Sequence, residues 1–185
     1  KGVLTRIKEI VKVLDIPVIV KEVGAGISND VAKRLENVGV AAVNIAGHGG
    51  TSWAGVEKLR AEMAQNAIKT RIGELFWDWG IPTALSLIEV RNAVKIPIIA
   101  SGGIRNGLEI AKCLVLGANV CAMAYPFLKK ADESLDNLLL FTETLVEELK
   151  STMFLVGAQT IQELKASRYR ITGNLKEDLG VLNES

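Results

Sequence analysis

Apolar positions along the chain follow two spacings, one typical of amphipathic helices and one typical of buried strands. Val3–Leu14 repeats apolar residues at helical spacing. Ile16–Val20 is a short β-branched run that is apolar on both faces, as strands of a buried parallel sheet are. Ser28 can cap a following helix, Gly39 can end it, and Ala41–Ala46 is a second apolar run. The opening segment therefore predicts helix, strand, helix and strand.

The same order returns in the second half of the chain. Ile96–Ala100 predicts a strand, Leu108–Leu116 a helix and Asn119–Ala124 another strand. Ile96–Ile99 repeats Ile16–Ile19 almost residue for residue. The chain therefore contains two similar βαβ units.

Three further segments surround these units. Gly47–Gly80 is a loop-plus-helix excursion between them, and Thr83–Val94 is predicted to be helical. Ser134–Lys150 has leucines on one face and begins a tail that is helical throughout. We expect the tail to pack outside the sheet.

Four parallel strands joined by helices form either an open doubly wound sheet or half of an eight-stranded barrel. The internal repeat favours the barrel. We predict an α/β fold, the C-terminal half (about four β/α units) of a (β/α)8 TIM barrel plus a helical C-terminal tail. Residues 1–132 would form the half-barrel, with an insertion at about 47–80, and 133–185 a helical extension of the same domain. Unpaired edge strands would need an N-terminal half that lies outside this sequence.

The composition of the chain limits the classes of molecule that it is expected to bind. The 185 residues are 49% hydrophobic, and 22 Lys and Arg nearly balance 21 Asp and Glu. This balance argues against nucleic acid and anionic membranes, and no apolar run is long enough to span a bilayer. Cys113 and Cys121 lie in apolar stretches and suit core packing in a reducing compartment. We expect a cytoplasmic protein with small-molecule partners.

Ligands of parallel α/β folds bind at the carboxyl ends of the strands, where two segments here suit a phosphate. Gly102 and Gly103 let the backbone approach closely at the start of a helix, and Arg105 adds a cation. Ala124 and Tyr125 come after the fourth strand at a second helix start. A tight turn that needs glycine for steric reasons alone remains an alternative.

Four other side chains come after the first two strands. His48 is a candidate general base or a residue that only positions the backbone. Thr51 can bond a cofactor or turn the loop, and Trp53 can wall an aromatic ligand or fill the core. Lys21 needs an anionic partner if it is buried, and otherwise extends to solvent.

Five motifs, spread between Ile16 and Phe127, together resemble a known family. Several FMN-dependent barrels share the pattern of Ile98–Arg105 and Gly117–Ala124. Three segments point more narrowly to the type 2, FMN-dependent isopentenyl-diphosphate isomerases: Val-Lys-Glu-Val-Gly-x-Gly from Val20, Gly-Gly-Thr-Ser-Trp from Gly49, and Trp-Gly-Ile-Pro-Thr from Trp79.

The resemblance implies roles for individual residues. Lys21 and Thr51 would contact the flavin, and Trp53 would lie near the substrate. The phosphate would be held by Gly102, Gly103, Ile104, Arg105, Ala124 and Tyr125. The catalytic residue is unassigned, with Trp53 and His48 as candidates, and no metal ligand is predicted in this chain.

The implied enzyme interconverts isopentenyl and dimethylallyl diphosphate in isoprenoid biosynthesis, using reduced FMN. NADPH would be the reductant, Mg²⁺ would bind the diphosphate, and the protein would be a homo-oligomer, a tetramer or larger. The family's Asn-x-x-Gln-Glu segment, which supplies substrate and Mg²⁺ ligands, precedes these strands and is absent from this sequence. The chain alone would therefore be an incomplete enzyme.

Two alternatives remain. One is an FMN-dependent 2-hydroxy-acid oxidase or dehydrogenase, which also has a His-Gly segment and a Gly-Gly-x-Arg loop. That chemistry uses an Arg soon after the His to hold the substrate carboxylate, where Thr51 stands here. The other is a half-barrel that binds a phosphate ligand without catalysis.

Overall fold

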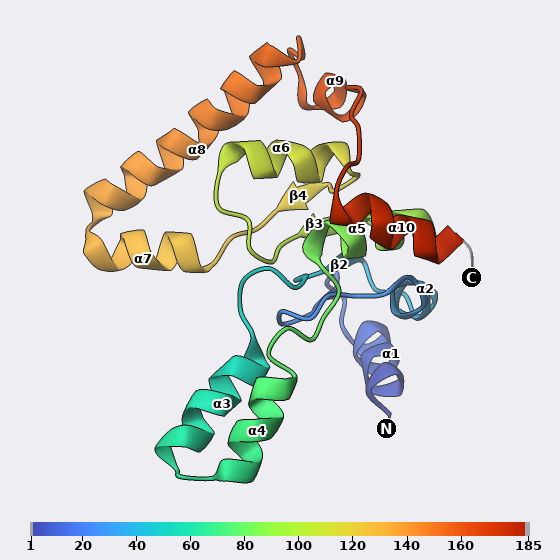
Figure 1. The fold of residues 1–185 in the computed structure, drawn as a ribbon. Coiled ribbons are helices and arrows are strands. Elements are labelled where there is room, and N and C mark those ends of the chain that lie inside the picture. The colour runs from blue at the N-terminus through green and yellow to red at the C-terminus, as the bar shows by residue number, and fades with distance from the viewer. Residues whose placement is uncertain (1, 184–185) are drawn as a thin grey trace.

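The computed structural model describes residues 2–183. Four short strands form one parallel sheet in chain order (Figure 1). The strands are β1 (Ile19–Lys21), β2 (Ala42–Asn44), β3 (Ile98–Ala100) and β4 (Val120–Cys121). Lys21 pairs with Asn44, and Asn44 with Ile99. Because all the strands run the same way, their carboxyl ends meet at one edge of the sheet.

Helices connect the strands in the predicted α/β order. They are α1 (Val3–Val13) before the sheet, then α2 (Asn29–Asn37), α5 (Thr83–Ala93), α6 (Gly107–Val115) and α7 (Tyr125–Glu133). Local capping explains where two of them begin. The Ser28 hydroxyl accepts the Val31 N–H at the start of α2, and the Asn106 side chain accepts the Glu109 N–H at the start of α6.

The strands are shorter than the apolar runs predicted. Ala41–Ala46 and Asn119–Ala124 each contain a strand of two or three residues. Ala46 has a φ of 36°, so the backbone leaves the extended conformation soon after β2 ends. The first strand begins at Ile19 instead of Ile16, since Pro17 has no N–H to add to a ladder.

The excursion at 47–80 contains two helices, where one helix and a loop were predicted. α3 (Trp53–Met63) and α4 (Ala67–Leu75) pack on each other as a hairpin that projects from the sheet (Figure 1). Gly73 makes the close approach possible, because a Cβ there would lie 2.7 Å from the Ala54 carbonyl oxygen. The asparagine that caps α4, Asn66, accepts the Lys69 N–H.

The predicted tail contains α8 (Leu135–Leu155), α9 (Ile161–Lys165) and α10 (Asn174–Asn183). α8 extends beyond the predicted end at Lys150 and contacts both α6 and α7. Gly107 faces α8 at close range and donates its N–H to the Glu148 carboxylate at 2.6 Å. The shorter helices α9 and α10 contact α6 and α5, so the tail covers the outside of the sheet's helices.

The core lies between the sheet and these helices. Its most deeply buried large side chains include Val43, Ile45, Leu87 and Ile98. Both cysteines are free thiols: Cys113 is buried and Cys121 is half-buried. The neighbouring Cys113 thiol and burial both raise the pKa of Cys121, so this group is protonated at neutral pH. Within residues 2–183, no helix combines the length and apolar character needed to cross a bilayer.

Candidate functional site

A cavity of about 600 Å³ opens at the carboxyl edge of the sheet. It is lined by all eight residues predicted to hold a cofactor: Lys21, Thr51, Gly102, Gly103, Ile104, Arg105, Ala124 and Tyr125. These residues lie up to about a hundred positions apart in the sequence. They meet because parallel strands deliver their connecting loops to the same edge.

One wall of the cavity presents backbone N–H groups that have no protein partner. Among residues 2–183, the N–H groups of Gly103, Ile104, Ala124 and Tyr125 donate to no acceptor. Two of them precede α6 and two stand at the start of α7, where the helix dipole adds positive potential. Such a wall suits an anion with several oxygens, such as a phosphate.

Steric need explains the glycine pair as well. Gly102 and Gly103 have φ values of 109° and 77°, in the left-handed region that other residues rarely adopt. A Cβ on Gly102 would overlap the Gly47 carbonyl, and one on Gly103 would overlap that of Gly49. The glycines therefore allow two loops to touch, and the same backbone leaves the Gly103 N–H without a protein acceptor.

Arg105 ties these two loops together at the rim of the cavity. Its guanidinium donates to the Gly103 carbonyl at 2.6 Å and to the Gly49 carbonyl at 3.1 Å. Its own N–H donates to the Glu109 carboxylate at 2.7 Å. The side chain is exposed and adds a positive charge beside the unpaired N–H groups.

Lys21 lies across the cavity at the end of edge strand β1, and its side chain is exposed. Its ammonium donates to the Glu22 carbonyl at 2.8 Å. The Glu22 carboxylate accepts the N–H groups of Gly24, Ala25 and Gly26 at 2.6, 2.6 and 3.2 Å. Glu22 thus fixes the loop after β1, a role that the sequence reasoning missed although a carboxylate before Gly-x-Gly suits such a backbone nest.

Asn44 is a second residue that the sequence reasoning missed. It is 7% exposed, and its side-chain oxygen accepts the Ser101 hydroxyl at 2.6 Å and the Ala46 N–H at 3.3 Å. Asn44 lines the cavity, and its amide nitrogen donates to no acceptor among residues 2–183. A polar residue within an otherwise apolar strand run was the available signal.

The two catalytic candidates do not line this cavity. The His48 backbone is fixed by bonds with Ile81 and Thr83, and its Nε2 lies 3.9 Å from a carboxylate oxygen of Asp78. Trp53 is 51% exposed and donates its indole N–H to the Val23 carbonyl at 3.1 Å, at the edge of the site. Both residues lie next to the cavity, since Gly47 precedes His48 and Val23 accepts the Trp53 indole N–H, and both stay candidates.

Comparison with solved structures confirms the predicted class of fold. The chain matches a lactate oxidase from Pediococcus acidilactici with a TM-score of 0.70 and 24% identity, over 92% of this chain and 41% of the oxidase. It matches a mandelate oxidase with a TM-score of 0.67 and 20% identity, over 91% of this chain and 42% of the other. At these identities the likeness shows the fold alone.

Known protein sequences resemble this chain more closely than these solved structures do. A protein named isopentenyl-diphosphate delta-isomerase from Methanothermobacter thermautotrophicus is 47% identical over 95% of this chain and 49% of its own length. The protein of that name from Pyrococcus furiosus is 46% identical over 95% of this chain and 44% of its length. The chain thus spans about half the length of the curated relatives it matches. The sequence pattern of the FMN-dependent dehydrogenases matches residues 3–171, and the chain belongs to that family.

Proposed function

We propose that this chain supplies the FMN phosphate site of an isopentenyl-diphosphate delta-isomerase, which interconverts isopentenyl and dimethylallyl diphosphate. The observation that supports it most directly is the meeting of all eight predicted cofactor residues around one cavity. The relatives that are 46–47% identical bear the isomerase name. Membership of the FMN-dependent dehydrogenase family supports the cofactor.

The residues present fit FMN at two points. The unpaired N–H groups of Gly103, Ile104, Ala124 and Tyr125 suit the phosphate, and Arg105 adds charge there. Lys21 offers an ammonium that suits the electron-rich edge of the flavin ring. When bound in its reduced form, FMN would supply an electron-rich ring beside the double bond that moves.

The chain's own residues then have positioning tasks. Lys21 and Thr51 would orient the ring, while the Asn44 amide would donate to an acceptor on the cofactor or substrate. Glu22 would hold the loop that carries the Trp53 contact, through its bonds to three successive N–H groups. The group that moves the proton is not assigned to this chain.

A second half-barrel would complete the enzyme in this proposal. β1 and β4 are the two edges of the sheet, and Ile19 and Val120 on them are 53% and 56% exposed. Four further strands would cover both edges, which accords with relatives about twice as long. We propose that the Mg²⁺ ligands lie in that other half, with the Asn-x-x-Gln-Glu segment that the family resemblance implies.

Several finer expectations belong to the same proposal. We propose NADPH as the reductant, a homo-oligomer of four or more subunits, and a cytoplasmic location. Size-exclusion chromatography with light scattering would measure the number of subunits. A monomer would contradict the expected assembly but would not bear on the proposed flavin site.

The test uses the protein at its full native length. Purified protein is titrated with FMN and divided into two anaerobic portions. One portion is reduced with NADPH and given isopentenyl diphosphate, and the other is kept oxidised and given lactate. We expect the protein to bind FMN and to convert isopentenyl diphosphate to dimethylallyl diphosphate only when the flavin is reduced. The flavin should still be reduced when the conversion is complete. Riboflavin, which lacks the phosphate, serves as the matched control ligand for the N–H wall.

Other outcomes would support one of the two alternative functions or contradict the proposed site. Flavin reduction by a 2-hydroxy acid, without isomerase activity, would establish the oxidase. Phosphate binding without flavin binding would establish the non-catalytic half-barrel. Failure to bind either ligand would overturn the proposed site.

A further inference from the structure

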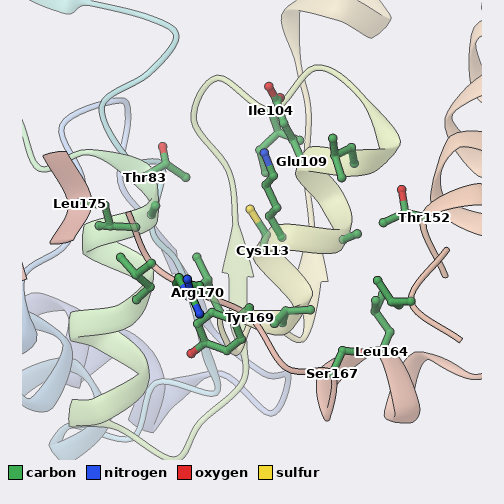
Figure 2. A pocket seen from close by; sticks show the side chains of 18 of the residues that line it. Thr83, Ile104, Glu109, Cys113, Thr152, Leu164, Ser167, Tyr169, Arg170 and Leu175 are labelled. Atoms are coloured by element: carbon green, nitrogen blue, oxygen red, sulfur yellow. The ribbon is translucent and has the colours of Figure 1, made fainter. Parts of the chain in front are cut away.

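A second cavity, of about 540 Å³, lies outside the sheet between α5, α6 and the C-terminal segment. Figure 2 shows side chains from these elements converging on it, among them Cys113, Leu164 and Leu175. Its surface is mainly apolar, and its volume falls within the range of small-molecule sites. The site proposed for FMN does not use this space.

The wall on the C-terminal side is a strap, defined here as residues 168–172, that joins α9 to α10. The strap has no regular secondary structure. Within the described part of the chain, none of its residues makes a hydrogen bond. Only side-chain packing holds it over the cavity, so opening it breaks no hydrogen bond.

The charges around this cavity are mostly positive. Lys112 on α6 and Arg168 and Arg170 on the strap all line it, and none has a carboxylate within 4 Å among residues 2–183. The one acidic residue that lines it is Glu109, whose carboxylate already accepts the Arg105 N–H. An apolar cavity lined by exposed, unpaired cations is complementary to an anion with an apolar body.

The two cavities share a wall. Gly102, Gly103 and Ile104 line both, and Ile104 is buried between them. Thr83, which also lines the outer cavity, donates its hydroxyl to the Gly102 carbonyl at 2.6 Å. A ligand that fills the outer cavity on this side would therefore contact the backbone of Gly103 and Ile104, whose N–H groups are unpaired.

We propose that the outer cavity is a binding site for a free amphipathic anion, a molecule with an apolar chain and one anionic head group. The chain packs against α6 at Leu108 and Val115, and the head group pairs with Arg168 and Arg170. A filled cavity supports the shared wall in the conformation that holds a phosphate, so the ligand tightens FMN binding. The effect on FMN binding rests on the proposed function, whereas the outer site itself does not.

Dodecanoate is the probe, and 1-dodecanol is its neutral counterpart. Calorimetry on the full-length protein without flavin should show saturable dodecanoate binding, about tenfold weaker in the Arg168→Gln/Arg170→Gln double variant. 1-Dodecanol should bind the wild type and the double variant equally. Arg34→Gln, an exposed arginine on α2, is the matched control and should leave dodecanoate affinity unchanged.

A second variant tests the cavity itself. Val115→Trp fills the cavity from α6 and should abolish binding of both probes, while its circular dichroism and melting show that it is folded. Saturating dodecanoate should lower the FMN dissociation constant about fivefold in the wild type and not in Val115→Trp.

No saturable binding of dodecanoate, or unchanged binding in both variants, would overturn the site. Equal loss of dodecanoate and 1-dodecanol in the arginine variant would overturn the anion assignment. If saturating dodecanoate leaves the FMN dissociation constant of the wild type unchanged, only the coupling between the two sites would be overturned. Dodecanoate binding to a protein that binds no FMN would leave the site standing and reject the proposed function.

Discussion

The Ser101 hydroxyl donates to the Asn44 side-chain oxygen at 2.6 Å, which joins β2 to the loop after β3 beneath the cavity. Asn44 also accepts the Ala46 N–H, at the point where the backbone turns out of the strand. Both partners of the short bond are at least nine-tenths buried. The floor of the candidate site is therefore a polar contact inside an apolar core, and it should be sensitive to substitution.

Asn44→Ala should lower the free energy of unfolding by about 1–3 kcal/mol, because two buried donors lose their acceptor. Urea denaturation of the full-length protein measures the change. Asn37→Ala, at an exposed position on α2, is the control and should stay within about 0.5 kcal/mol of the wild type. Equal effects of the two substitutions would contradict the role given to Asn44.

Glu22→Gln should raise the FMN dissociation constant about tenfold, because the neutral amide is a weaker acceptor for the three N–H groups of the loop after β1. Quenching of flavin fluorescence measures it. Glu57→Gln on α3 removes an exposed carboxylate and should have no effect. Glu22→Asp, which keeps the charge, should recover part of the affinity, and no recovery would argue that the carboxylate's charge is unimportant.

Arg105→Gln should weaken FMN binding by about tenfold to a hundredfold, since it removes both a cation and the tie between Gly103 and Gly49. Riboflavin affinity should change much less, because riboflavin has no phosphate. Arg105→Lys keeps the charge but not the two-carbonyl bridge, so its loss should be intermediate. An equal loss for FMN and riboflavin would mean that Arg105 does not act through the phosphate.

Gly103→Ala should disrupt the site, because a Cβ at a φ of 77° overlaps the Gly49 carbonyl. We expect a loss of more than about 1 kcal/mol in unfolding free energy together with weaker FMN binding. Gly180→Ala in α10 is the control, since nothing lies within 4 Å of the new methyl group. It should be neutral or stabilise the protein by up to about 1 kcal/mol. A Gly103→Ala protein with wild-type stability would show that the two loops are not in contact.

The sequence by itself determined the α/β order and the positions where chemistry could collect. β-Branched runs beginning at Ile16 and Ile96 indicate buried strands, because only such short apolar segments suit a sheet covered on both faces. The loop after each parallel strand must reach the same edge of the sheet, so Lys21, Thr51 and Arg105 could be assigned to one site before any contact was visible. These inferences depend only on local pattern and on the geometry of parallel sheets.

Only the tertiary structure decided which partners each group meets. The Asn44–Ser101 bond spans 57 positions and the Arg105–Gly49 bond spans 56, and no local pattern encodes such pairs. The backbone of His48 is bonded to Ile81 and Thr83, more than thirty positions away, and these bonds decide where its side chain stands. The strap at 168–172 has no apolar period, and it closes a cavity only because α9 and α10 dock on different helices. Long-range packing fixes these relationships, so they appear only when the chain is folded.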